Sequence, residues 1–85
     1  MNNYYFTFGS DPAYPYGMND YVLVVAENIN QACELFEAVH PHRPGSQAIN
    51  CAFYYTEEQF REFQPRYYPN TPPIEIIAVT RREDA

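Results

Sequence analysis

The chain has 85 residues, the length of one domain, and eleven acidic residues against five basic ones give it a formal net charge of −6. Attraction to a phosphate backbone needs clustered cations, so this balance argues against direct binding of DNA or RNA. Nine tyrosines and six phenylalanines, with no tryptophan, make a composition typical of a binding surface.

We see no targeting or membrane segment. The start of the chain lacks the charged and long apolar parts of an export signal, and no apolar run is long enough to span a bilayer. We therefore expect a cytoplasmic protein that does not contact membranes. In that reducing compartment Cys33 and Cys51 should be free thiols. A core this small favours self-association through the first strand or the aromatic loop described below, so we expect a homo-oligomer.

Two strands are predicted before the first helix. Residues 4–8 alternate with period two, which places three aromatic side chains on one face: Tyr4, Phe6 and Phe8. Residues 21–26 are an unbroken apolar run rich in valine, the pattern of a strand covered on both faces. This second strand is the predicted central strand of a sheet.

A helix is predicted to begin near Ile29 and to end at Pro41. Asn28 can cap the first free N–H groups, with Gln31 in the capping-box position. Proline disfavours helical backbone in the residue before it and has no N–H to donate, so the helix stops there. One buried stripe at helical spacing should contain Ile29, Ala32, Cys33, Phe36 and His40.

The second half of the chain repeats the order of strand and helix. Residues 49–55 alternate and predict a strand with one face made of Ile49, Cys51, Phe53 and Tyr55. Thr56 opens a second capping box and a short helix, which we expect Pro65 to close, with an ion pair between Glu57 and Arg61. Residues 74–79 predict the last strand, and residues 79–85 a frayed charged tail.

The order β-β-α-β-α-β predicts an α+β fold, a compact single domain over residues 1–85. Its sheet should be mixed and four-stranded, with one or two helices on a face. The first helix is long enough for a parallel crossover, and the loop after it also permits an antiparallel return. The sequence leaves the topology open between these two.

The loop of residues 9–19, called the aromatic loop below, is predicted to be a ligand clamp. Tyr14 and Tyr16 would stack on a planar ligand, while Asp11 and Asn19 would read its polar edges. The alternative is a lid whose rings complete a thin core. Long ordered loops in small domains are often functional, which keeps the clamp in consideration.

A second candidate site lies in the loop that follows the first helix. His42, Arg43 and Ser46 flank a Pro-Gly turn, where backbone N–H groups and a guanidinium can bind an anion. The simpler alternative is that His40 caps the helix and the turn only reverses the chain. Arg66 could cover a nucleotide together with nearby rings, or it could be a solvated helix residue.

No catalytic or metal-binding framework can be assembled from the spacings. Cys33, His40, His42 and Cys51 lie seven, two and nine positions apart, which matches no short-paired zinc site. Cys51 with His40 would make a nucleophile pair, but no oxyanion motif lies near them. We therefore expect no enzyme, no metal and no cofactor.

Several short motifs carry a resemblance to a known group of proteins. They lie at residues 4–10 (YYFTFGS), 15–17 (PYG), 19–22 (NDYV), 40–46 (HPHRPGS) and 50–56 (NCAFYYT). On these motifs the chain resembles small accessory proteins carried by bacterial prophages and integrative elements, over most of residues 4–60. The resemblance implies no catalytic residue. It implies a context in which such proteins bind and block components of host defence.

Two functions fit these observations. The one favoured by a narrow margin is a non-enzymatic phage or mobile-element protein that sequesters a small nucleotide-like ligand between tyrosines and arginines of its loops, to counter host defence. The other is an acidic protein-interaction module that inhibits a host defence or nucleic-acid-handling protein, with carboxylates standing in for phosphates. The aromatic loops support the first, and the net charge supports the second.

Overall fold

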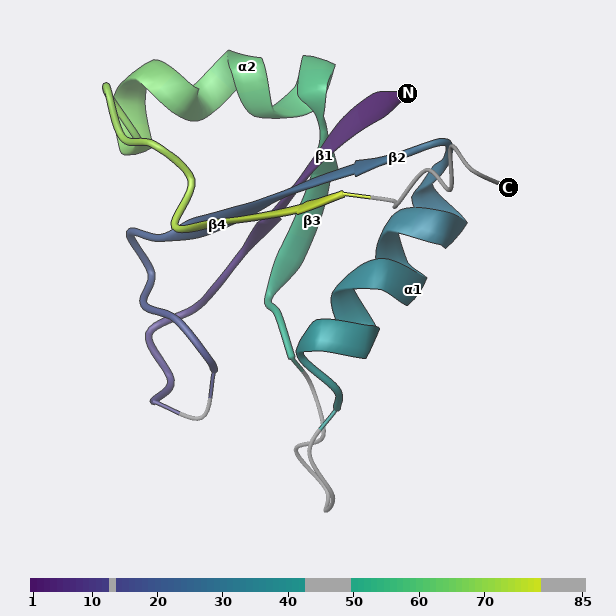
Figure 1. Cartoon of the computed structure of the whole chain (residues 1–85). Coiled ribbons are helices and arrows are strands. Elements are labelled where there is room, and N and C mark those ends of the chain that lie inside the picture. Colours follow the sequence, from purple (N-terminus) through teal and green to yellow (C-terminus); the bar gives the residue numbers. More distant parts are fainter. Residues whose placement is uncertain (13, 43–49, 79–85) are drawn as a thin grey trace.

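The computed structural model describes residues 1–12, 14–42 and 50–78 (Figure 1). Six elements follow one another along the chain: β1 (Asn2–Thr7), β2 (Tyr21–Ala26), α1 (Ile29–Val39), β3 (Phe53–Thr56), α2 (Glu57–Tyr67) and β4 (Glu75–Ala78). This order confirms the predicted β-β-α-β-α-β arrangement and the α+β class. The predicted charged tail, residues 79–85, lies outside the described residues.

The four strands form one mixed sheet in the order β3-β1-β2-β4. β1 runs antiparallel to both of its neighbours, whereas β4 is parallel to β2. β2 and β3 therefore point the same way, and α1 crosses from one to the other past β1. This settles the topology that the sequence left open.

The sheet restricts one of the two expected routes of self-association, the one through the first strand. β1 hydrogen-bonds to β2 on one side and to β3 on the other, so its backbone has no free edge for a second copy. The edges of the sheet are β3 and β4. Self-association, including the route through the aromatic loop, stays a prediction, but a second copy cannot add to the sheet along β1 where it pairs with both neighbours.

Each helix covers half of one face of the sheet, and the two helices lie on opposite faces (Figure 1). α1 packs against β2 and β4, where the buried cluster includes Phe6, Val22, Val24 and Phe36. α2 packs against β1 and β3, where a smaller cluster joins Tyr21, Phe60 and Tyr68. Stacked rings link each helix to β1, with centroids 4.4 Å apart for Phe6 and Phe36 and 4.2 Å for Tyr5 and Phe60.

The central strand β2 is covered less evenly than its sequence suggests. Val22, Val24 and Ala26 are fully buried beneath α1. On the opposite face Tyr21 is buried, but Leu23 and Val25 are only half-buried because α2 lies over β1 and β3. Cover on both sides is therefore complete at one end of β2 only.

Both helices begin as their sequences predict. The side chain of Asn28 accepts a hydrogen bond from the backbone of Gln31 at 2.8 Å, and Thr56 and Gln59 form the reciprocal capping box of α2. The Gln31 side chain binds the backbone N–H of Glu27, one residue before the cap. α1 ends at Val39 with His40 as its cap, just ahead of the proline.

Several element boundaries differ from the prediction: β1 spans Asn2–Thr7 rather than residues 4–8, and β4 spans Glu75–Ala78 rather than 74–79. Pro65 does not close α2, which continues to Tyr67. A proline near the end of a helix removes one backbone bond, and the next turn still closes because the N–H of Tyr68 binds the carbonyl of Gln64 at 2.7 Å. β3 begins only at Phe53, so Cys51 lies before the strand, and Ile49 lies outside the described residues.

The loops gather at one end of the sheet. The register places Thr7, Tyr21 and Phe53 together at this end, where the aromatic loop leaves β1 and enters β2. β4 also starts there, since Glu75 lies beside Val22. The connections after β1, α1 and α2 therefore meet at one end of the sheet, and the first strand starts at the other.

Candidate functional site

The aromatic loop folds back onto the core. The ring of Tyr16 meets the ring of Phe8 edge-on, with centroids 5.4 Å apart. The centroid of the Tyr14 ring lies 6.5 Å from that of Phe8. Both tyrosines pack against the cluster beneath α1. A side chain at Gly9 would come within 3.0 Å of the Tyr14 ring, so the glycine permits this close approach. These contacts fit the lid alternative better than a pair of rings waiting for a ligand.

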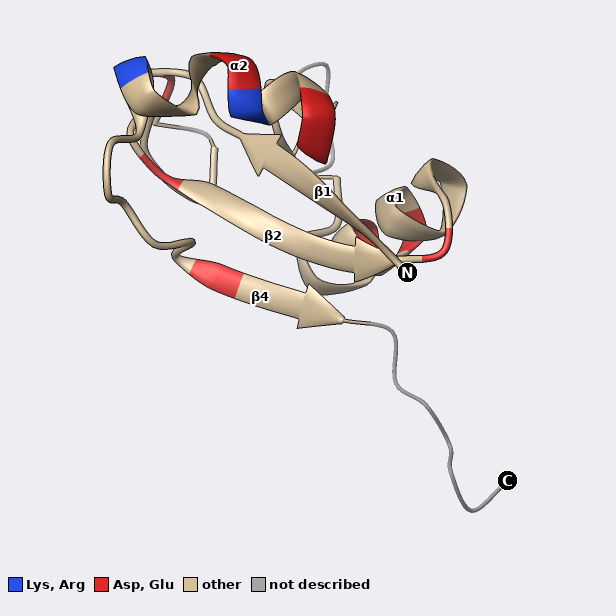
Figure 2. Cartoon of the chain, turned by 90° about the horizontal axis from the view of Figure 1, so that it is seen from above, with Lys and Arg blue, Asp and Glu red and all other residues tan. Residues whose placement is uncertain are grey.

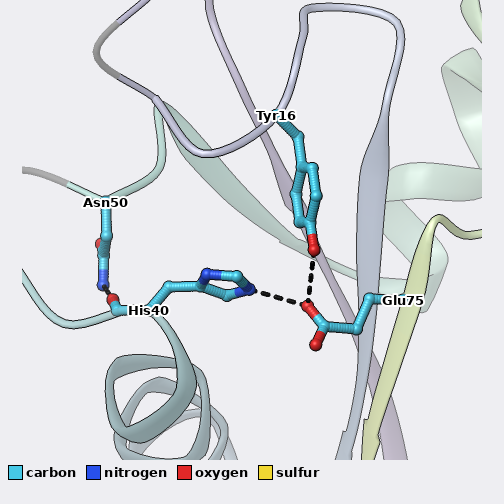
Figure 3. A network of polar contacts seen from close by, with 4 residues as sticks. All are labelled: Tyr16, His40, Asn50 and Glu75. Carbon is cyan, nitrogen blue, oxygen red and sulfur yellow. Dashed lines mark hydrogen bonds and ion pairs between the residues drawn. The ribbon is translucent and has the colours of Figure 1, made fainter.

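A polar network fixes this lid to the rest of the molecule (Figure 3). One carboxylate oxygen of Glu75 accepts a hydrogen bond from the Tyr16 hydroxyl at 3.3 Å and lies 2.7 Å from Nε2 of His40. The Asn50 amide donates to the His40 carbonyl at the end of α1. Burial, followed by the nearby Glu75 carboxylate, raises the pKa of the Tyr16 hydroxyl. The network joins the aromatic loop, α1 and β4.

The other predicted site residues are not gathered into one place. Asp11 is exposed at the start of the aromatic loop, where its carbonyl accepts from the N–H of Tyr14. His42 is exposed, and its Nε2 atom lies 4.0 Å from a carboxylate oxygen of Glu37 in α1. Arg66 is exposed in the last turn of α2. Arg43 and Ser46 lie outside the described residues.

A pocket of about 480 Å³ opens between α2 and the sheet, and we call it the α2-side pocket. Its walls come from the end of β1, the last residues of the aromatic loop, β3 and the second half of α2. The lining residues include Phe8, Met18, Asn19, Phe53, Phe63 and Tyr67. Of the predicted clamp residues, only Asn19 lines it. The pocket therefore takes no ring from the predicted clamp, whereas Phe63, Tyr67 and Tyr68 are the rings that the sequence placed near Arg66.

A second pocket of about 340 Å³ lies on the opposite face, between α1 and β3, and we call it the α1-side pocket. Cys33, Phe36, Glu37, Cys51, Phe53 and Tyr54 are among its lining residues. Burial, with a smaller effect of the neighbouring Cys33, raises the pKa of the Cys51 thiol to about 11, so it stays protonated at neutral pH. Both cysteines are free. Within the described ranges no group of histidine, cysteine and carboxylate side chains could hold a metal ion.

Phe53 lies at the junction of the two pockets. It lines both, and it begins β3, the strand at one edge of the sheet. Its side chain is 63% exposed, and that of Tyr54 is also largely exposed. We call this region the β3 edge surface, defined by Phe53, Tyr54 and the two pockets.

The sequence pattern placed Phe53 and Tyr55 on one face of a strand and the rings near Arg66 beside a possible nucleotide, but it did not indicate that these aromatics meet at an exposed edge. The signal was present in the run Phe53-Tyr54-Tyr55, since adjacent aromatics in a strand must point to opposite faces. A run of this kind needs cover on both sides. Here Tyr55 packs against Phe63, while Phe53 and Tyr54 stay exposed.

Comparison of the chain with protein-family models, curated proteins and solved structures found no match. The fold and the site together define a small α+β domain that presents aromatic pockets on both faces of an edge strand. Neither helix among the described residues is long and apolar enough to cross a membrane.

Proposed function

We propose that the chain is a non-enzymatic binding protein that docks on a protein partner through its β3 edge surface. The observation that carries this proposal is the pair of aromatic pockets that meet at the exposed Phe53. Exposed rings next to apolar pockets are typical of the anchor residues of protein interfaces. Of the two functions drawn from the sequence, this is the protein-interaction module.

The shape of the α2-side pocket favours a polypeptide over a small molecule. Small-molecule sites commonly enclose about 70–90% of their ligand. Here Met18, Phe53 and Tyr67 line the pocket while 58%, 63% and 60% of their own surfaces remain exposed. Because these lining residues stay so exposed, the pocket is better suited to a single side chain of a larger protein partner than to an enclosed small molecule.

The carboxylates around these pockets also support a protein partner, one with basic side chains. Glu37 lines the α1-side pocket, and Glu58 and Glu62 line a shallow depression beside Tyr55. None of the described arginines lines these three surfaces, and Figure 2 shows acidic positions on both helices. A nucleotide-like ligand would bring phosphate to surfaces whose described lining holds carboxylates and no arginine, with His42 beside Glu37 in the α1-side pocket, whereas a basic protein would be attracted to these carboxylates.

A small planar ligand is the second candidate function. The α2-side pocket supports it, because its volume is suitable and Asn19 could bind a polar edge of a ring stacked on the aromatic walls. Countering host defence, by either route, is a further part of the proposal that rests on the resemblance to phage accessory proteins.

The first experiment locates the binding surface in the protein's own host cells. Tyr54 is replaced by the photo-reactive p-benzoylphenylalanine, and the control carries the same group at Ile76, which is exposed on the opposite edge strand, 62% against 51% for Tyr54. We expect illumination to give a defined adduct with another protein from position 54 and little from position 76.

Native mass spectrometry of the purified wild-type chain provides the contrasting outcome. Retention of a small molecule that is lost in a Tyr67→Ala variant, together with no protein adduct from position 54, would replace the interaction module with the small-ligand function. Equal adducts from both positions would show that the β3 edge surface is not the interface.

A further inference from the structure

Resting on the proposed function, we propose that the partner contributes an extended segment that adds a fifth strand to the sheet along β3. The segment would place large apolar side chains in the two pockets and a lysine or arginine beside Tyr55. Three features of the described residues support it: the edge of β3 with which no described strand pairs, the two pockets beside it and the carboxylates of α2.

The backbone of β3 is suited to strand addition. β3 pairs with β1 on one side, and no described strand pairs with it on the other. An edge strand presents N–H and C=O groups that an extended peptide can bind. Residues 53–56 contain no proline and no charged side chain, features that commonly protect an edge. The other edge, β4, follows Pro72 and Pro73 and contains Glu75.

The pockets lie where the side chains of an added strand would point. Successive side chains of a strand alternate between the two faces of a sheet. Phe53 lines both pockets, which lie on opposite faces, so two consecutive residues of the segment would reach one pocket each. Specificity in strand addition comes from such pockets for alternate side chains.

The carboxylates indicate where a basic residue belongs. Tyr55 lies two positions along β3 from Phe53 and therefore on the same face, next to Glu58 and Glu62 of α2. A partner residue two positions from the apolar one in the α2-side pocket would face these carboxylates. The expected core of the segment is therefore two consecutive large apolar residues with a lysine or arginine at one end.

The same charges disfavour a second copy of this chain at β3. Two copies paired antiparallel along β3 would place their α2 helices on the same face, with Glu58 and Glu62 of each approaching the other. Each chain has a net charge of −6, so like charges would oppose this contact, whereas a basic segment removes the repulsion.

A peptide-display selection on the purified wild-type chain tests the inference. Random peptides of about twelve residues are long enough to cover β3 at about 3.3 Å per residue. We expect the enriched peptides to share two consecutive apolar residues with a lysine or arginine at one end. Hydrogen exchange should then show slower exchange at the amides of residues 53–56 when an enriched peptide, synthesised alone, is bound.

A matched pair of variants measures the contribution of the surface. Phe53→Ser should weaken binding of that peptide about tenfold or more, because it removes a side chain shared by both pockets. Ile76→Ser changes an equally exposed residue on the opposite edge, 62% against 63%, and should leave the affinity within about twofold. Glu62→Lys should weaken binding and reduce its dependence on salt.

Peptides that bind equally well to Phe53→Ser, or that slow exchange only in α1 or β4, would overturn strand addition and leave the proposed docking function standing. Slower exchange of residues 53–56 that grows with protein concentration alone would assign the edge to a second copy, against the proposal. Absence of any enriched peptide would also overturn it, and the crosslinking experiment would then decide separately whether the docking function holds.

Discussion

Glu75 is the residue through which the aromatic loop, α1 and β4 are joined. Replacing it with alanine would leave both the Tyr16 hydroxyl and the His40 ring without their shared acceptor. Such losses in a partly buried site cost about 1–3 kcal/mol. Tyr16→Phe removes only the longer of the two bonds, so it should cost less, about 0.5–1.5 kcal/mol.

Urea unfolding of the two variants checks this order. His40→Gln keeps a donor in place of the ring and serves as the conservative control. If Glu75→Ala is as stable as the wild type, the network in Figure 3 does not hold the lid in place.

At the scale of elements, the stability of α2 depends on the hydrogen bonds of its N-cap residue, Thr56. Thr56→Ala should lower the free energy of unfolding by about 1 kcal/mol, because the N–H of Gln59 loses the oxygen that it binds at 3.2 Å. Thr56→Ser keeps that oxygen and should restore most of the loss. Chemical denaturation measures both variants, and an unchanged midpoint for the alanine variant would contradict the role of this cap.

The elements that the sequence predicts well are those set by local chemistry. Asn28 and Thr56 cap their helices because a short side-chain oxygen next to free N–H groups is a local arrangement. The alternation of Tyr4, Phe6 and Phe8 likewise needs only a strand with one buried face. The α+β class and the mixed sheet follow from the order of such elements.

The element boundaries that the sequence predicts poorly depend on contacts between residues far apart in the chain. Pro65 stays inside α2 because Phe63 and Tyr68, on either side of it, pack against an aromatic cluster that includes Phe60. This tertiary packing outweighs the local preference of proline. The alternation of residues 49–55 fails for a similar reason: Cys51 packs beneath α1, whereas Phe53 turns toward the opposite face.

The candidate site could be predicted only in part. Tyrosine-rich loops indicated a binding surface, and Asn19 does line a pocket. The rings of Tyr14 and Tyr16 instead cover the core, which depends on the position of Phe8 in the folded chain. The β3 edge surface arises because strand order places β3 at an edge, and strand order cannot be read from local patterns.

For the molecule as a whole, stability should fall in alkaline solution. Burial is the first cause of a raised pKa at six groups: Tyr5, Tyr16, Tyr21, Tyr68, Cys33 and Cys51. The unfolded chain would lose these protons first, near pH 9.0 for the thiols and 10.0 for the phenols. Their contribution to stability is therefore complete below about pH 9 and is lost as the pH rises through the folded values.

Urea unfolding from neutral pH to pH 11 checks this expectation, and the free energy of unfolding should decrease steadily above pH 9. Cys51→Ala removes the group whose pKa is raised to about 11 and should flatten part of that decrease. A free energy of unfolding that stays constant up to pH 11 would mean that these groups titrate alike in the folded and unfolded chains.

The register of the sheet has a consequence for how the domain can be built into larger molecules. Asn3 and Ala78 both lie beside Val25, on either side of it, so the two ends of the described chain are about two strand spacings apart, roughly 10 Å. Phe53 lies at the far end of the sheet. A short linker could close the chain into a circle or splice it into a host protein, with the β3 pockets still facing outward.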